Sequence, residues 1–346
     1  MTLGADCHKQ THTLVAVDEV GREVGSRTVA ATPAGHLEVL KWAKRWRERR
    51  WALEDCRHVS RRLEYDLLSA REAVVRVSPK MMAGTRRSAR QFGKSDPIDA
   101  LAVARAALRE PNLPLAQLEG PSRALRLLVD RRDDLVAERT REINRLHWHL
   151  HELAPGYRVP GRTFTQASTW KTVAEEVAKH QGLVAELATE LLVAIQDLTA
   201  KADSLERRIA ALTAQLAPSL LKLQGCGTLT AAKLVAETSE VSRFASRARF
   251  ARDNGTAPIP ASSGSRQRVR LNRGGNRQLN AALHRIAITQ VRLNGRGKLY
   301  LDKQIAAGHS KTEALRALRR RISDEVYRRL WDDQRQTATH SSELAA

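Results

Sequence analysis

The sequence predicts three successive regions: an α/β N-terminal domain, a long helical coiled-coil linker and a mainly α-helical C-terminal domain. Up to about residue 115, short apolar strand-like segments alternate with helical ones. Between residues 183 and 216, apolar positions recur every three or four residues. After Pro218, glycine-containing turns separate further helical segments. We therefore place the domains at 1–115, 116–217 and 218–333, with a flexible tail over 334–346 because that segment is polar and aperiodic.

The N-terminal domain begins with strand-like alternation. Residues 1–30 have the pattern of a β-hairpin whose turn lies near 18–21. The elements expected next are a helical stretch through 37–46, a short buried strand over 51–53 that ends at Glu54, a helix around 63–68 and a strand over 73–77.

An alanine-rich helix follows and runs from the segment 95–99 to about Leu108. Asp96 suits the N-cap position and Pro97 suits the first turn. This helix completes the alternating α/β pattern.

The spacing over 183–216 predicts a helix about 50 Å long at about 1.5 Å per residue. Leucines and one isoleucine between residues 125 and 153 form a second series that predicts an opposing helix, and the segment 155–162 separates the two. A coiled-coil arm fits this pattern, and an ordinary helical bundle is the alternative.

Charge is concentrated in the C-terminal region. The chain has 59 Lys and Arg against 38 Asp and Glu, a net charge of +21 with histidine neutral. Residues 243–298 contain twelve Arg and one Lys against the single acid Asp253, which gives 13 − 1 = +12. Such a charge predicts a polyanionic partner, and nucleic acid is the first expectation.

Composition excludes several classes of protein. A chain with 42% hydrophobic and 28% charged residues is not disordered, and no run reaches the ~18 apolar residues that a membrane span needs. The N-terminus lacks a signal-peptide core. Cys7, Cys56 and Cys226 fit neither a disulfide framework nor zinc-ligand spacing. We expect a soluble protein of a reducing compartment, with no membrane partner.

Four acidic residues form the first candidate site. In an α/β domain of the RNase H type, carboxylates on the first strand, a nearby strand and a later helix converge on Mg²⁺. Asp6 is expected at the start of the first strand and Glu54 at the end of the buried strand. Asp96 and Asp99 are three residues apart and project to one side of a helix start. Their order predicts one site for Mg²⁺, or for Mn²⁺ in its place.

Each acid also has a structural interpretation. Asp96 could cap its helix while Asp99 adds favourable charge to the first turn. Asp6 could be a turn residue, and Asp55 is an alternative to Glu54.

A serine loop forms the second candidate site. The segment 258–268 contains Ser262 and Ser263 among arginines and is followed by a glycine-rich stretch. Attack by a serine hydroxyl on a DNA phosphate requires removal of its proton and stabilisation of the developing charge. His284 is on the following helix rather than beside the serines, so a metal held by the acidic residues is the expected activator. The alternative is a flexible basic loop that only grips phosphates.

Together these motifs resemble the DEDD-type insertion-sequence transposases, also called insertion sequence family one-ten, which are bridge-RNA-guided DNA recombinases. The resemblance extends over residues 1–330. Its opening G-x-D-x-x-K-x-x-H motif is similar to residues 4–12, and its K-[ST]-D-x-x-D-A box to residues 94–100. The C-terminal motifs of the family have counterparts at 225–231, 243–244, 255–258, 263–264 and 275–279.

Two positions stay open within this resemblance. The family usually has E-x-T-G at the second acid, whereas this chain has Glu54 followed by Asp55, Cys56 and Arg57. The strand context favours Glu54. The two serines are adjacent, and Ser263 is favoured because it directly precedes the matched Gly264.

The resemblance implies an RNase H/RuvC-like domain with the tetrad Asp6, Glu54, Asp96 and Asp99, a helical linker, and a transposase domain with Ser263 as nucleophile. It implies Mg²⁺, a structured guide (bridge) RNA, donor and target DNA, and a serine-phosphate intermediate. It also implies a homodimer or homotetramer in the cytoplasm of a prokaryotic cell, associated with the nucleoid.

The residues expected to bind nucleic acid lie in the basic region and in one glycine turn. The turn Gly225-x-Gly227 is no dinucleotide fingerprint, because Thr230 replaces the third glycine, but its backbone N–H groups suit a phosphate. The others are Arg266, Arg268, Arg270, Arg273, Asn276 and Arg277. A zinc site at His147, His149 and His151 is not expected, since only the outer two share a helical face.

Two other functions remain compatible with these residues. One is a RuvC-like metal-dependent transposase or nuclease that uses water as nucleophile. The other is a non-catalytic nucleic-acid-binding protein in which the acids are structural.

Overall fold

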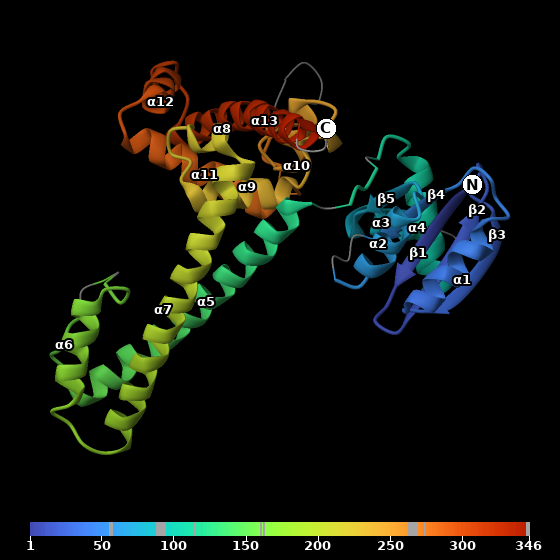
Figure 1. Cartoon of the computed structure of the whole chain (residues 1–346). Coiled ribbons are helices and arrows are strands. Elements are labelled where there is room, and N and C mark those ends of the chain that lie inside the picture. The colour runs from blue at the N-terminus through green and yellow to red at the C-terminus, as the bar shows by residue number, and fades with distance from the viewer. Residues whose placement is uncertain are drawn as a thin grey trace. The chain divides into compact units, whose positions relative to one another are not determined.

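The computed structural model describes residues 1–54, 58–87, 95–113, 115–118, 120–159, 161, 163–261, 269–272 and 274–343. The chain folds into two compact units, Met1–Leu118 and Glu119–Ala346. Figure 1 shows a strand-containing first unit and a helical second unit with a long arm.

The first unit is built on a five-stranded sheet. Its spatial order is β3-β2-β1-β4-β5, with β1, β2 and β3 antiparallel and with β4 and β5 parallel to β1. The strands are β1 (Thr2–Cys7), β2 (Thr11–Val17), β3 (Glu23–Ala30), β4 (Arg50–Glu54) and β5 (Val74–Val77). The predicted mixed α/β fold is confirmed. Asp6, however, is the fifth residue of β1, so the prediction that it starts the strand is wrong: pairing with β2 already begins at Thr2.

Helices cover both faces of this sheet. The helices are α1 (Pro33–Ala43), α2 (Arg61–Ser69), α3 (Pro79–Arg87) and α4 (Asp96–Arg109). Leu3 and Leu53 share one core cluster with residues of α1 and α2. Ala52 and Val75 share another with residues of α3 and α4. Because side chains alternate along a strand, Asp6 and Glu54 project to the α4 face.

Gly4 sets the distance between β1 and α4. A Cβ at Gly4 would lie 2.2 Å from the backbone oxygen of Ala100 and 2.5 Å from the nitrogen of Ala104. Only glycine permits this approach. The glycine therefore lets the first turns of α4 lie against the strand that carries Asp6.

The arm of the second unit is an antiparallel helix pair. It consists of α5 (Pro121–Leu153) and α7 (Leu183–Leu216), with α6 (Ala167–Val177) packed at the far end (Figure 1). Leu135 packs with Leu198 near the middle, and Leu146 shares a cluster with Leu192 toward α6. The bounds of α7 are those that the apolar spacing predicts.

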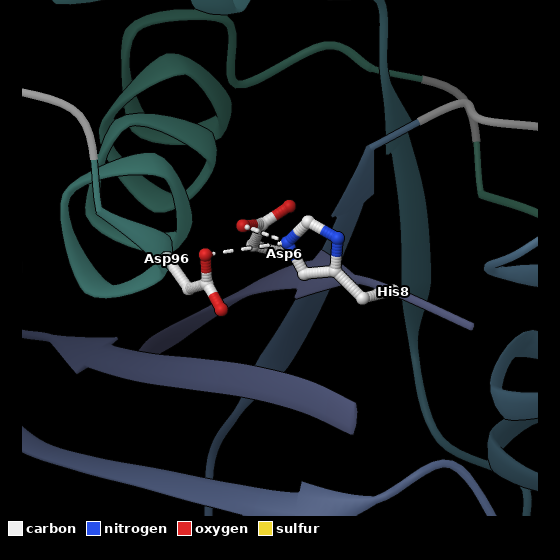
Figure 2. Close-up of side chains that lie close together, drawn as sticks. All are labelled: Asp6, His8 and Asp96. Carbon is white, nitrogen blue, oxygen red and sulfur yellow. Dashed lines mark hydrogen bonds and ion pairs between the residues drawn. The ribbon is translucent and has the colours of Figure 1, made fainter. Parts of the chain in front are cut away.

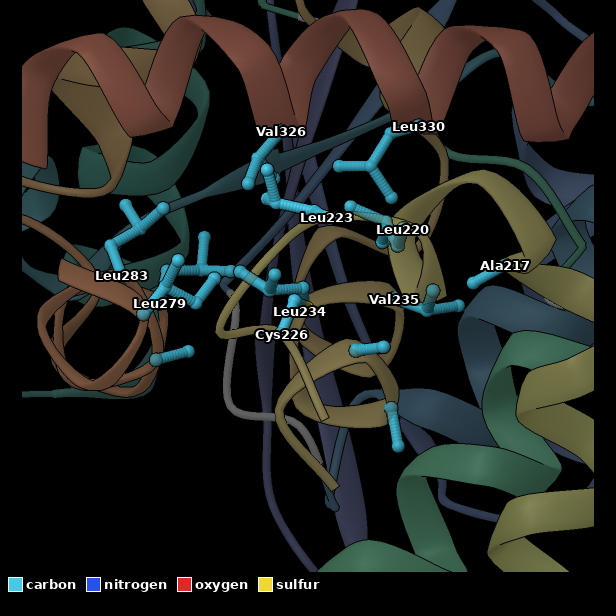
Figure 3. Close-up of a cluster of buried hydrophobic side chains, with 14 of the residues drawn as sticks. Ala217, Leu220, Leu223, Cys226, Leu234, Val235, Leu279, Leu283, Val326 and Leu330 are labelled. Atoms are coloured by element: carbon cyan, nitrogen blue, oxygen red, sulfur yellow. The ribbon is translucent and has the colours of Figure 1, made fainter. Parts of the chain in front are cut away.

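The rest of the second unit surrounds one apolar core. Figure 3 shows that side chains of α9, α11 and α13 contribute to this core. The core also contains Leu125 of α5 and Ile209 of α7. The base of the arm is therefore part of the same core. The elements are α8 (Pro218–Leu221), α9 (Thr228–Thr238), η1 (Val241–Arg243), α10 (Arg247–Asp253), β6 (Ile259–Pro260), β7 (Val269–Arg270), α11 (Arg277–Arg292), α12 (Arg296–Ala306) and α13 (Lys311–Glu343). The predicted mainly helical C-terminal domain is confirmed.

Several elements differ from the prediction. Helices α3 and α6 were not expected, and Ile259 and Pro260 of the predicted serine loop form the short strand β6, which pairs with β7. Helix α13 extends to Glu343, so the flexible tail predicted over 334–346 is helical for most of its length. In the described part of the chain, no helix combines the length and apolarity that crossing a membrane requires.

Candidate metal centre and serine hairpin

Strand register brings two of the predicted acids to one edge of the sheet. In the parallel pair β1 and β4, Ala5 lies opposite Leu53, and the next residues are Asp6 and Glu54. Asp6 is buried, with 5% of its surface exposed, and Glu54 is half-buried. Both follow apolar strand residues at the carboxyl edge of the sheet, and both project toward α4.

The start of α4 supplies the other two acids. Ser95, rather than Asp96, has the extended backbone of the N-cap, and Asp96 is the first helical residue. The expected N-cap position of Asp96 is therefore wrong by one residue. The Asp96 side chain is about half exposed and Asp99 is buried. Since Gly4 permits close packing of α4, this helix start lies beside Asp6.

His8 joins two of the carboxylates (Figure 2). Its Nε2 lies 3.1 Å from Asp6 Oδ2 and 3.4 Å from Asp96 Oδ1. One ligand atom from each of these three residues lies within 4.8 Å of the others. The structure thus brings Asp6 and Asp96 together and adds His8, which the sequence did not single out.

The electrostatics of this cluster extend to Asp99. Burial raises the pKa of Asp6, the interaction with His8 lowers it, and the charges of Asp99 and Asp96 raise it further. A divalent cation would relieve this repulsion between carboxylates. Carboxylate oxygens are the ligands that Mg²⁺ prefers, so the donor set fits that ion, and a histidine nitrogen is better suited to orienting the carboxylates.

A short hairpin of β6 and β7 flanks the serine segment in the sequence. Ile259 of β6 pairs with Arg270 of β7, and Pro260 pairs with Val269. The Arg270 side chain is exposed. The predicted residues Ser262, Ser263, Arg266, Arg268 and Arg273, and the alternative acid Asp55, lie outside the described residues.

Asparagine side chains fasten the β6 end of this hairpin. Asn254 is fully buried, donates from Nδ2 to Ser323 Oγ at 2.8 Å and accepts at Oδ1 from the Thr256 hydroxyl at 2.6 Å. Asn280 donates to the Asn254 carbonyl at 2.9 Å. The backbone that leads into β6 is therefore held to both α11 and α13.

The β7 end is fastened in a similar way. Asn272 donates to the Arg252 carbonyl at 3.0 Å. A Cβ at Gly275 would lie 2.3 Å from the Gly255 nitrogen, and Gly255 itself has a φ of +74°. The two ends of the hairpin thus meet backbone to backbone, which requires glycine at both positions.

Asn276 has a structural role at the start of α11. Its Oδ1 accepts from the backbone N–H groups of Gln278 and Leu279, as an N-cap does. Its Nδ2 donates to Glu237 Oε2 at 2.8 Å. Arg277 is exposed one residue later. Contact of Asn276 and Arg277 with nucleic acid stays a prediction.

The turn before α9 has two different glycines. Gly225 has a φ of +83°, and a Cβ there would lie 3.0 Å from the Ile286 carbonyl oxygen, so packing against α11 explains it. Gly227 is the N-cap of α9 and has open space where a Cβ would be. Of these two glycines, Gly225 is therefore explained by packing, whereas Gly227 has no neighbouring atoms that would require glycine there.

Comparison with known proteins gives two family matches. Residues 3–155 match a DEDD-type family model of IS110 transposases, described as "Transposase". Residues 217–302 match "Transposase IS116/IS110/IS902 family".

Two similar proteins align over most of the chain, and a third aligns over part of it. The insertion element IS116 44.8 kDa protein of Streptomyces clavuligerus is 28% identical over 95% of this chain and 94% of its own length. The insertion element IS900 42 kDa protein of Mycobacterium paratuberculosis is 25% identical over 95% of both. The insertion element IS110 43.6 kDa protein of Streptomyces coelicolor is 37% identical over 31% of this chain and 27% of its own length.

Among solved structures, T. thermophilus RuvC in complex with Holliday junction substrate matches 33% of this chain and 98% of its own, at 15% identity and a TM-score of 0.27. The mixed five-stranded sheet and the matched DEDD model identify the N-terminal unit as a RuvC-like α/β domain. With both family models matched in order and relatives aligned over nearly its whole length, the chain belongs to the IS110/IS116/IS900 family of DEDD transposases.

Proposed function

We propose that this transposase cuts and rejoins donor and target DNA with a divalent ion, Mg²⁺ or Mn²⁺, held by Asp6, Glu54, Asp96 and Asp99. The observation that carries the proposal is the convergence of Asp6, His8 and Asp96 within 4.8 Å. Strand register supports Glu54, and the electrostatic effect on Asp6 supports Asp99.

Each residue has a distinct part in this site. Asp6 and Glu54 anchor the ligand set to the sheet, while Asp96 offers a half-exposed carboxylate toward DNA. His8 Nε2 bridges Asp6 and Asp96 and fixes the orientation of both carboxylates. A divalent ion held by these residues would supply Lewis-acid stabilisation of the phosphate and would lower the pKa of the attacking hydroxyl.

Water is the simplest nucleophile for this site. The acidic cluster lies wholly within the RuvC-like unit, and hydrolysis needs no group from another unit. Cleavage by water would leave a free phosphate end and no protein attached to the strand.

Ser263 is the second candidate nucleophile. Its oxygen would form an ester with the DNA phosphorus as the bond to the leaving strand oxygen breaks; the serine proton passes to a base and the leaving oxygen gains a proton. The ester keeps the bond energy for rejoining. The hydrogen-bonded asparagines at both ends of the hairpin support this route, because they hold in place the two strands that flank the serine segment in the sequence.

A structured guide RNA and a homodimer or homotetramer complete the proposal. The +12 charge over residues 243–298 provides electrostatic affinity for nucleic acid of either kind. A multimer would allow the serine of one protomer to meet the acids of another.

A denaturing gel separates the two nucleophiles. The full chain is incubated with the co-purified RNA, end-labelled DNA and Mg²⁺. The serine route predicts a labelled protein–DNA adduct that Ser263→Ala abolishes and Ser262→Ala retains. Cleaved DNA without adduct supports water, and the reverse serine result assigns Ser262.

Asp6→Asn and Asp96→Asn test the metal site in the same reaction. Both should abolish cleavage while DNA binding persists. Cleavage by both variants at the wild-type rate would exclude the acidic cluster, and binding without cleavage by the wild-type chain would favour the non-catalytic alternative.

A further inference from the structure

A cavity of about 610 Å³ lies at the base of the serine hairpin, within the second unit. Its walls come from the segments 255–258 and 269–272 and from helices α12 and α13. Its volume is in the range of sites for small organic ligands, about 300–1,000 Å³. The proposed function makes no use of it.

The lining is strongly cationic. Five arginines line it against two carboxylates, Glu313 and Asp324. Both carboxylates are engaged, since Asp324 pairs with Arg320 and Glu313 accepts hydrogen bonds from Ser310. In the described part of the chain, Arg316 and Arg319 form no ion pair with a carboxylate.

Arg319 is held in place yet incompletely satisfied. Its Nη1 donates to Asn280 Oδ1 at 3.1 Å, and its buried Nε has no hydrogen-bond partner in the described part of the chain. Burial lowers the pKa of Arg319, and the neighbouring charge of Arg316 lowers it further. A phosphate bound between Arg316 and Arg319 would offset the repulsion between the two guanidinium groups.

The same cavity has an apolar side. Pro258, Leu271 and Tyr300 line it, and the half-buried Tyr300 packs against the core of the unit. An aromatic ring of this kind offers a stacking surface that accepts any base. Phosphate-binding and base-binding groups therefore lie in one cavity.

We propose that this cavity accepts one unstacked nucleotide of the DNA strand beside the serine hairpin, with its phosphate on Arg316 and Arg319 and its base against Tyr300. The assignment to DNA rests on the proposed function, in which the hairpin presents its serine to a DNA phosphate. Extrusion of a nucleotide would hold the strand in register with the loop.

Fluorescence anisotropy with the full chain in EDTA tests this without any cleavage. The probes are a short labelled DNA duplex, the same duplex with one bulged nucleotide, and the duplex with an abasic bulge. We expect about tenfold tighter binding of the bulged nucleotide than of either other probe, the effect of one base–aromatic contact. Equal binding of all three, or of the two bulges, would overturn the proposal.

Variants of residues that line the cavity test whether the preference for the bulged nucleotide arises there. Arg319→Gln removes the phosphate contact, Tyr300→Leu removes the stacking surface, and Ala317→Phe fills the cavity without changing charge. Tyr300→Leu and Ala317→Phe should abolish the preference for the bulged nucleotide, and Arg319→Gln should weaken binding of both bulged probes relative to the duplex. Arg328→Gln is the matched control, because Arg328 is on the same helix, pairs with Glu325 and does not line the cavity.

The control should weaken all probes alike and keep the preference. Circular dichroism confirms that each variant is folded. A preference that survives in all three cavity variants contradicts the proposal, as does stronger binding of a bulged RNA duplex than of the bulged DNA. Absence of a protein–DNA adduct would refute the serine route while leaving this binding result intact, so the two failures are distinguishable.

Discussion

At Gly4 the absence of a side chain determines how closely α4 approaches β1. A Cβ would lie 2.2 Å from the Ala100 oxygen, a backbone atom that moves only if the helix moves. The same helix carries Asp96 and Asp99. Because Gly4 has a hydrogen atom in place of a side chain, α4 can lie close enough to β1 to bring Asp96 and Asp99, two of the four proposed metal ligands, to the site.

Gly4→Ala should push α4 away from the sheet. We expect a loss of about 1–3 kcal/mol in the free energy of unfolding, as for other overpacked cores, and at least a tenfold loss of Mg²⁺-dependent cleavage. Urea unfolding and the cleavage gel measure the two effects. Gly84→Ala in α3 is the control, because nothing lies within 4 Å of its Cβ position. Wild-type cleavage by Gly4→Ala would show that α4 does not set the site.

We expect the buried residue His12 to make the first unit sensitive to acid. Its Nε2 lies 3.1 Å from His36 Nε2, and His36 Nδ1 lies 2.6 Å from Asp66. Burial and the neighbouring His36 lower the pKa of His12 from 6.5 to about 4. The folded state therefore keeps His12 neutral at a pH where the unfolded chain already binds a proton.

Stability should fall as pH decreases from 6.5 to about 4, because the unfolded state binds more protons in that window. The contribution of His12 is at most about 3 kcal/mol, from about 2.5 pKa units at 1.36 kcal/mol each. Urea unfolding at pH 7.5 and pH 5 should show a smaller pH effect in His12→Gln than in the wild type. An equal effect in both would assign the acid sensitivity to other groups.

Glu237 links three helices of the second unit, α5, α9 and α11. This buried residue of α9 accepts from Asn276, the N-cap of α11, and pairs with Arg126 of α5 at 3.3 Å. A second contact joins the same helices, since Lys233 of α9 lies 2.7 Å from Asp133 of α5. The arm, α9 and the start of α11 are thus linked through polar groups as well as through the core.

Glu237→Gln should loosen the start of α11 and, with it, the end of the serine hairpin. Loss of hydrogen bonds to a buried charge costs about 1.5–3 kcal/mol. We expect slower adduct formation at nearly unchanged DNA affinity, measured on the denaturing gel and by anisotropy. Glu206→Gln, which breaks the more exposed pair with Arg132, should affect neither.

Some helices of the fold could be predicted from sequence patterns alone, and others could not. Helix α7 has the predicted bounds because its apolar residues repeat over 34 residues. Helix α6 buries only Thr169, Val173 and Val177, too short a pattern to detect, and α3 has Gly84 in its interior. Strand register explains why Asp6 and Glu54 lie at the same edge of the sheet. His8 is an exposed residue after β1, and its role depends on where α4 begins. That position depends on tertiary packing at Gly4.

At the scale of the whole molecule, two units with separate cores should unfold separately. The acidic cluster lies in Met1–Leu118 alone. Calorimetry should therefore show two transitions, and Mg²⁺ should raise the midpoint of only one. At a hundredfold excess over the dissociation constant, an ion stabilises by about 2.7 kcal/mol.

EDTA should reverse this shift, and Asp96→Asn should reduce it. A shift of both transitions, or an undiminished shift in Asp96→Asn, would place the ion elsewhere. For each variant, the unfolding midpoint in Mg²⁺ is compared with the midpoint of the same variant in EDTA.

The root of the arm has a mechanical consequence. Leu125, Val129 and Ile209 are buried in the core that α9, α11 and α13 share, so the arm cannot pivot there without opening apolar packing. The arm therefore has no flexible joint at its base. A force applied near α6 would be transmitted as torque to α11 and α13, the helices to which the hairpin is fastened, so a partner bound at the distal end of the arm could shift the hairpin.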